Sequence, residues 1–130
     1  MKQLTKLTEL NKKKIKKIVN LTIMWSIKEW GLNKRRKNIL TVDFSWDENE
    51  DMGRYFSSEN KIVIYPKMIR NIRDLIDTVI HEFTHQMQSL SNYNLILSKT
   101  GYKDHPMEIE ANEIALENRA KCWKEIKSLC

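Results

Sequence analysis

The sequence is poor in the residues that interrupt or cross-link a chain. Its 130 residues include two prolines, three glycines and two cysteines. Cys122 and Cys130 lie eight positions apart in a stretch that we expect to be mostly helical, a spacing that does not favour a disulfide. A disulfide-stapled scaffold is therefore excluded, and we expect free thiols in a reducing compartment, the cytoplasm.

Long apolar runs are also lacking. No run approaches the roughly 20 apolar residues that a membrane span requires, and the first six residues contain no apolar core of a secretory signal. The length and an apolar content of 41% are sufficient for one hydrophobic core. We therefore predict a single domain over 1–130 that does not contact a membrane.

Acidic residues are scarce at the beginning of the chain. Residues 1–40 carry twelve Lys or Arg and two acids, a balance of +10, whereas residues 41–130 carry eleven and fifteen, a balance of −4. One interpretation is a solvated helix face. The other is a surface for nucleic acid or another anionic partner.

The most informative stretch contains an amphipathic helix. Its apolar residues recur at steps of three and four, which predicts a helix over 72–90. Asn71 is the expected N-cap, and the polar cluster from Ser89 is the expected end. The apolar residues are Ile72, Leu75, Ile76, Val79, Ile80, Phe83, Met87 and Leu90.

This helix contains the H-E-x-x-H motif His81-Glu82-Phe83-Thr84-His85. Residues four apart lie above one another on a helix, so His81 and His85 can bind one metal ion. Glu82 lies about 100° around the axis, where its carboxylate can take a proton from a water that the metal activates. The alternative is two ordinary helix histidines beside a solvated glutamate.

A catalytic zinc ion takes three protein ligands and keeps one position open. No third histidine closely follows His85, so the third ligand is expected among residues 102–113. Pro106 begins a second predicted helix, over 107–120. Glu108 lies in its first turn, from which a side chain can reach an antiparallel neighbour.

Two alternatives to Glu108 remain. Glu110 lies about 200° from Glu108 on the helix, so both cannot bind the same ion, and His105 would give a three-histidine site. Asn112 follows Glu108 by four positions and shares its face. We predict that Asn112 supports a ligand histidine through the second ring nitrogen of that histidine.

The region before the motif predicts a small sheet. Residues 4–32 read as one long basic helix, or two shorter ones, ending at Gly31. Residues 38–46 form a strand, and 53–56 and 61–65 form a hairpin with a four-residue loop. We expect an α+β fold with a mostly antiparallel sheet of about three strands, whose edge either pairs with an extended peptide or is covered.

These motifs together carry a family resemblance over about residues 53–120. H-E-x-x-H followed by Glu108-Ile109-Glu110-Ala111-Asn112 resembles the gluzincin pattern, in which the second helix reads E-x-E-A-[DN]. It is similar to ImmA/IrrE-type phage and bacterial regulatory proteases, and it resembles prenyl-protease-type gluzincins without their membrane spans. The resemblance implies a zincin-like fold and Glu108 as the metal ligand. Because many gluzincins place a Tyr or His near the metal, it also implies an oxyanion role for Tyr102 or His105.

The sequence therefore predicts a zinc-dependent metallopeptidase that binds one Zn²⁺ through His81, His85 and Glu108 and cleaves protein or peptide substrates with Glu82 as general base. The alternative is a nucleic-acid-associated protein. It would be either a SprT-like protease or a basic binding module with a structural or vestigial metal site, and residues 1–40 would contact the nucleic acid.

Overall fold

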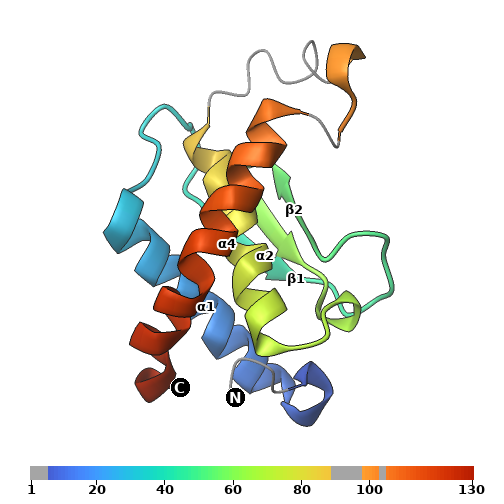
Figure 1. The fold of residues 1–130 in the computed structure, drawn as a ribbon, viewed down its shortest axis with the longest axis vertical. Coiled ribbons are helices and arrows are strands. Elements are labelled where there is room, and N and C mark those ends of the chain that lie inside the picture. Colours follow the sequence, from blue (N-terminus) through green and yellow to red (C-terminus); the bar gives the residue numbers. More distant parts are fainter. Residues whose placement is uncertain (1–5, 89–97, 103–104) are drawn as a thin grey trace.

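The computed structural model describes residues 6–88, 98–102 and 105–130, and shows an α+β arrangement in which helices cover one side of a small sheet (Figure 1). None of the helices in this part of the chain is long and apolar enough to span a membrane. The helices are α1 (Lys12–Trp30), α2 (Ile72–Met87) and α4 (Pro106–Ile126), the strands are β1 (Thr41–Phe44), β2 (Gly53–Phe56) and β3 (Lys61–Ile64), and the 3-10 turns are Leu7–Glu9, Pro66–Met68 and Lys127–Leu129.

The first predicted helix is shorter than expected at its beginning. A 3-10 turn comes first, and α1 begins after Asn11, whose side chain accepts a hydrogen bond from the Lys14 amide. Asn11 therefore satisfies one of the amides that a helix N-terminus leaves unpaired. The predicted stop is confirmed, because Gly31 adopts a positive φ of 78° that a residue with a Cβ rarely adopts.

The sheet differs from the prediction in the direction of one strand. Its order is β1-β3-β2, with β2 and β3 antiparallel but β1 and β3 parallel, so the sheet is mixed rather than mostly antiparallel. The predicted hairpin is confirmed, and it is a local structure. The partner of β1 is decided at long range, because the connection over 45–52 carries the chain past the position that β3 later fills. Ile62 and Ile64 in this central strand are fully buried.

Helix α2 is the central element of the fold, since it contacts α1, α4, β2 and β3. It begins after the predicted N-cap Asn71, whose side chain accepts a hydrogen bond from the Asp74 amide. Its last residue is Met87, followed by Gln88 as the C-cap, just before the predicted end at Ser89. Its apolar face lies in the hydrophobic core, where five residues have no exposed surface. These are Leu75, Ile76, Val79, Ile80 and Phe83.

Two features bring α4 close to α2. The small side chains of Ala111 and Ala115 are fully buried, which permits a close approach of the helices. Arg119 of α4 donates to Asp77 of α2 at 2.9 Å. The two helices therefore lie side by side, with the N-terminal end of α4 near the C-terminal end of α2 (Figure 1).

The strand β2 presses against α2 at Gly53. A Cβ at Gly53 would lie 2.8 Å from Thr78 Cγ2 and 3.3 Å from Glu82 Cγ. Only glycine therefore permits the present spacing between the strand and the helix. This contact places the beginning of β2 directly beside the glutamate of the H-E-x-x-H motif.

Gly53→Ala should destabilise the fold by about 1–3 kcal/mol, the usual effect of extra volume at a tightly packed position. Thermal and urea unfolding measure the change. Adding Thr78→Ser removes the clashing methyl group and keeps the hydroxyl that donates to Asp74 O. The double variant should therefore recover part of the loss. Gly53→Ala with wild-type stability would contradict the close approach.

Candidate metal centre

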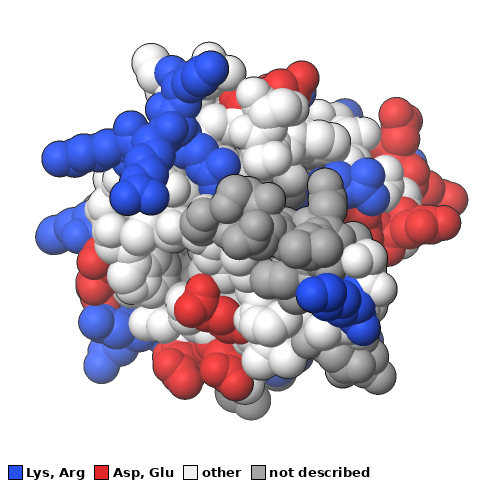
Figure 2. All heavy atoms as spheres, turned by 90° about the horizontal axis from the view of Figure 1, so that it is seen from above, with Lys and Arg blue, Asp and Glu red and all other residues white. Residues whose placement is uncertain are grey.

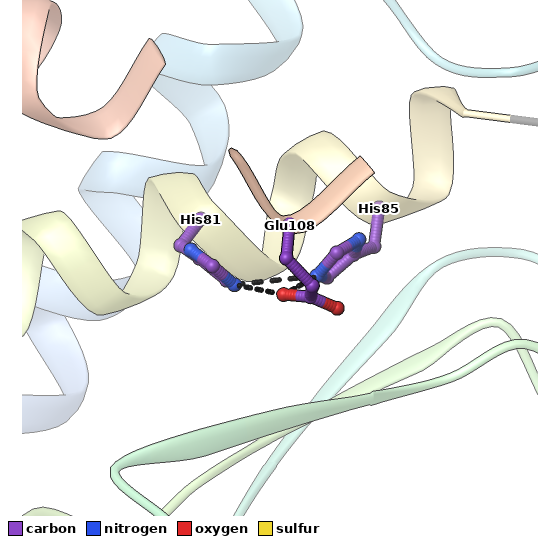
Figure 3. Close-up of side chains that lie close together, drawn as sticks. All are labelled: His81, His85 and Glu108. Atoms are coloured by element: carbon purple, nitrogen blue, oxygen red, sulfur yellow. Dashed lines mark hydrogen bonds and ion pairs between the residues drawn. The ribbon is translucent and has the colours of Figure 1, made fainter. Parts of the chain in front are cut away.

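The two motif histidines lie on one face of α2 and point to the same place. His81 Nε2 and His85 Nε2 are 3.2 Å apart, with the rings edge to face (Figure 3). Their side chains are 12% and 8% exposed. The i, i+4 spacing that the sequence predicts is therefore realised as a converging pair of ring nitrogens.

Glu108 completes the group from the first turn of α4. Its Oε1 lies 3.0 Å from His81 Nε2 and 3.2 Å from His85 Nε2, and all three ligand atoms lie within 4.8 Å of one another. Two ligands of a tetrahedral zinc ion at about 2.0–2.1 Å would be about 3.3 Å apart. The separations in the group match that value, so the residues present fit one metal ion.

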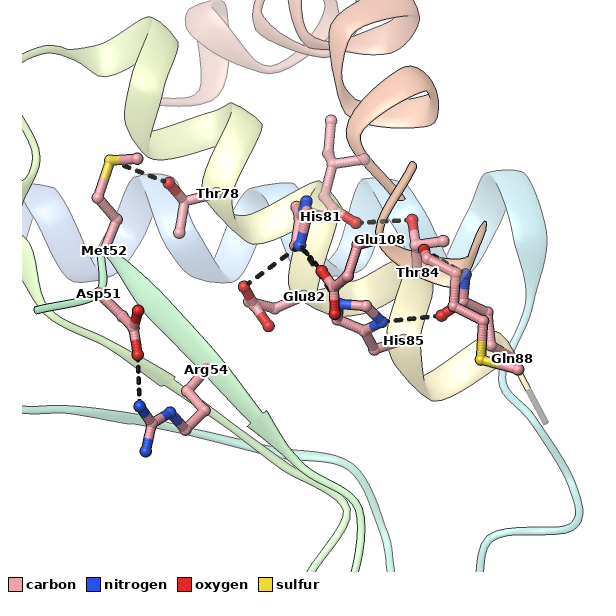
Figure 4. A network of polar contacts seen from close by, with 12 residues as sticks. Asp51, Met52, Arg54, Thr78, His81, Glu82, Thr84, His85, Gln88 and Glu108 are labelled. Atoms are coloured by element: carbon pink, nitrogen blue, oxygen red, sulfur yellow. Dashed lines mark hydrogen bonds and ion pairs between the residues drawn. The ribbon is translucent and has the colours of Figure 1, made fainter. Parts of the chain in front are cut away.

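The tautomer of His85 is set by Gln88. His85 Nδ1 lies 2.8 Å from Gln88 Oε1 (Figure 4). Gln88 Nε2 donates to Met107 O at 2.9 Å and to Glu110 Oε1 at 2.8 Å. Because the amide nitrogen faces two acceptors, its oxygen faces the ring, and Nδ1 must carry the proton. The lone pair of His85 is then on Nε2, the nitrogen that faces His81 and Glu108, as a metal ligand requires.

The electrostatics of the group favour a cation. Burial lowers the pKa of His85, but hydrogen bonding to Glu108 and the charges of Glu82 and Glu108 outweigh it, so that the pKa is raised. The site therefore attracts positive charge although it is buried. A bound metal ion would supply that charge without a proton.

Glu82 lies beside this group and does not belong to it. Its Oε2 is 3.9 Å from His81 Nε2 (Figure 4), and the residue is 8% exposed. Burial raises its pKa, the charges of His81 and His85 lower it, and those of Glu108 and Asp51 raise it further, with a net rise. Glu82 is therefore a buried carboxyl group beside the three candidate ligands, and its pKa lies above the ordinary value for glutamate.

Tyr102 approaches the group from the segment before α4. The residue as a whole is 62% exposed, yet partial burial still affects its phenol group. Burial, the charges of Glu108 and Glu82 and a hydrogen bond to Glu108 all raise its pKa. The phenol therefore stays protonated next to the predicted ligand, where it can donate a hydrogen bond.

The other predicted residues take different places. His105 is fully buried, and its Nδ1 accepts from the Met107 amide as the N-cap of α4, outside the three-residue group. Glu110 accepts from Gln88 and is also outside the group. Asn112 is exposed, and the second ring nitrogen of His85 contacts Gln88. Support of a ligand histidine by Asn112 therefore stays a prediction for His81 alone.

Sequence reasoning missed Gln88 and Arg36. The only signal for Gln88 is its position three residues after His85, on the same helix face. Arg36 comes from the loop after α1 and donates to three carbonyls at the end of α2, His85 O at 3.1 Å, Gln86 O at 3.2 Å and Gln88 O at 2.9 Å. No local pattern predicts this cap, because about fifty positions separate the partners.

Comparison with known proteins finds no match: no family model fits the chain, and no curated protein and no solved structure is significantly similar to it. The geometry of His81, His85, Glu108 and Glu82 is therefore the main indication of the class of protein.

Metal analysis of the purified protein tests the three ligands. His85→Ala and Glu108→Ala should each abolish stoichiometric binding, because two remaining donors do not hold a zinc ion in a tetrahedral site. Glu113→Ala, an exposed acid on the same helix as Glu108, is the matched control and should retain the ion. Loss of the ion in the Glu113 variant, or its retention without Glu108, would contradict the assignment.

Gln88→Met should weaken metal binding by about 10- to 100-fold, the usual effect of removing a residue that orients a ligand. Methionine is close to glutamine in size but accepts only weak hydrogen bonds from Nδ1. Titration calorimetry with Zn²⁺ measures the change. Asn112→Ala should leave the affinity within about twofold. The opposite order of effects would assign the supporting role to Asn112.

Proposed function

We propose that this chain is a zincin-like metallopeptidase of the gluzincin type, which hydrolyses peptide bonds with Glu82 as general base. The observation that carries the proposal is the convergence of His81 Nε2, His85 Nε2 and Glu108 Oε1, with Glu82 directly alongside. Two imidazoles and one carboxylate are the ligand set of thermolysin-type catalytic zinc sites. The proposed substrate is a protein or peptide.

His81, His85 and Glu108 would hold the ion. When bound, zinc supplies a Lewis acid that polarises a carbonyl group and makes a water molecule more acidic. The same donors also accept other divalent ions, and zinc is proposed because nitrogen-rich four-coordinate sites suit it.

Glu82 is proposed to move the proton. Its carboxylate would take a proton from the attacking water and pass it to the nitrogen of the leaving amine. Two features support this role. The residue is buried beside the ligand group, which strengthens its electrostatic interactions, and Gly53 fixes the distance between Glu82 and the neighbouring strand.

Tyr102 is proposed to stabilise the charge that develops on the carbonyl oxygen. Its phenol lies close enough to hydrogen-bond Glu108, and its raised pKa keeps it protonated. A protonated hydroxyl that points into the site can donate to an oxyanion. His105 is a poorer candidate, because its Nδ1 is engaged in capping α4.

The edge strand β2 is the proposed binding surface for the substrate backbone. Among the described strands β2 pairs only with β3, and its beginning lies beside Glu82. In the close-up of the site the strand runs alongside the ligand group (Figure 4). An extended peptide that adds to this edge would lie across the metal centre.

The test is cleavage of a fluorogenic peptide library by wild-type protein, metal-free protein and Glu82→Gln. Glu82→Gln should keep the metal and lose about 10²- to 10⁴-fold in kcat/KM, since general-base catalysis contributes about that much. Metal-free protein should be inactive and should recover on addition of Zn²⁺.

Glu113→Gln, an exposed glutamate of α4, is the control and should cleave like the wild type. If wild-type, metal-free and Glu82→Gln proteins all cleave the library equally, or all fail to cleave it, the proposed mechanism is wrong.

A further inference from the structure

We propose that the solvent-facing side of α1 and the loop after it bind nucleic acid, independently of the metal centre. This surface is called the basic ridge below. It consists of Lys13, Lys17, Lys28, Lys34, Arg35 and Lys37, all of which are exposed.

The members of the basic ridge differ from three other basic residues of the same region, which contact other side chains or the backbone of the protein. Lys12 lies 4.8 Å from the ring centroid of Trp46, and Lys16 lies 5.7 Å from that of Phe44. Arg36 caps the end of α2. Among the described residues no ion pair engages any member of the basic ridge, and the one acid of α1, Glu29, pairs with Lys121 at 3.8 Å.

Three members of the ridge lie on the face of α1 that points away from the core. At 100° per residue, Lys13, Lys17 and Lys28 fall within about 60° of one another around the axis. The buried residues of α1 occupy the opposite side, among them Ile15, Ile18 and Val19. The charges therefore form a line along the outermost part of the helix.

This distribution of charge is unfavourable for the isolated fold. The first turn of α1 contains no acid, although the helix dipole favours acids there and disfavours lysines. Lys13 and Lys17 are also like charges four positions apart, which repel one another. An anionic partner along the ridge would relieve both effects.

The loop continues the same line of charge and is held in place. Asn33 donates from its amide and its side chain to Gln86, at 3.1 and 3.0 Å, and Arg36 donates to the end of α2. Lys34, Arg35 and Lys37 are thereby presented to solvent from a fixed backbone. Basic side chains gather at the upper left of the face in Figure 2, on the side where this loop lies in Figure 1.

The chemistry of the ridge fits a nucleic-acid backbone better than other anionic partners. From Lys13 to Lys28 the helix rises about 22 Å, which spans about six phosphates of one DNA strand. Lysine is depleted in interfaces between proteins. A membrane-surface helix needs a free apolar face, and the apolar face of α1 lies in the core.

The experiment measures binding of the metal-loaded full chain to a fluorescent 20-base-pair duplex at 50–200 mM salt. If all six residues contact phosphates, the slope of log K against log salt should be about −5. Lys34→Gln/Arg35→Gln/Lys37→Gln should reduce the slope to about −3 and weaken binding at 50 mM salt.

Lys67→Gln/Lys99→Gln/Lys124→Gln removes the same charge from exposed positions elsewhere and is the matched control. It should keep the wild-type slope. Peptide cleavage and metal content should be unchanged in the loop variant, so failure of this proposal can be distinguished from failure of the proposed peptidase.

Three results would overturn the proposal. The first is no binding of the duplex at 50 mM salt. The second is an equal loss of affinity in the loop variant and the control, which would show that net charge alone is responsible. The third is binding of polyglutamate or of phosphatidylserine vesicles at least as tightly as the duplex, which would identify another class of partner.

Discussion

Two imidazole nitrogens and a carboxylate oxygen that face one another inside the protein are the constraint on which the rest of the structure depends. Gln88 Oε1 accepts a hydrogen bond from Nδ1 of His85 and so favours the tautomer with its proton on Nδ1. In that tautomer the lone pair of Nε2 lies 3.2 Å from an oxygen of Glu108. Acceptors at such distances repel unless a cation or a proton lies between them. A proton or a cation is therefore needed within the group, and the fold holds its three members in place through elements far apart in the sequence.

The two helices that carry the candidate ligands are arranged so that their dipoles favour the charges of Glu108 and of a protonated His85. Glu108 lies in the first turn of α4, where the helix dipole favours a negative charge, and His85 lies in the last turn of α2, where the dipole favours a positive one. Arg36 satisfies the last carbonyls of α2, and Gln88 joins that end to the first turn of α4. A bound cation would thus lie where the negative end of α2 meets a buried carboxylate.

The loop after α1 connects the two proposed activities of the chain. Its Arg36 is turned inward to the end of α2, whereas its other basic side chains face solvent. The proposed metal centre needs a dry and preorganised environment. The proposed nucleic-acid surface needs accessible charge that remains hydrated until a partner arrives. The same short segment serves both needs because Arg36 contacts the end of α2 while Lys34, Arg35 and Lys37 are exposed.

The sequence by itself determined the local features of this protein. Helical periodicity identified α2 and its N-cap Asn71, the strand pattern identified the β2–β3 hairpin, and the i, i+4 spacing placed His81 and His85 on one face. Helix position left Glu108, Glu110 and His105 as candidates, the family resemblance implied Glu108, and the structure groups Glu108 with the two histidines. The helix, the hairpin and the histidine spacing depend on neighbours within a few positions, which a single sequence contains.

Only the tertiary structure decided which distant groups meet. No local pattern encodes the parallel pairing of β1 with β3 or the cap from Arg36. The same holds for the contacts that join Gln88 to the first turn of α4. The physical reason is that these contacts depend on how the helices and strands pack against one another. Burial of the shared apolar core sets the relative positions of the helices and strands. These positions decide which polar groups at the ends of the elements are close enough to form hydrogen bonds.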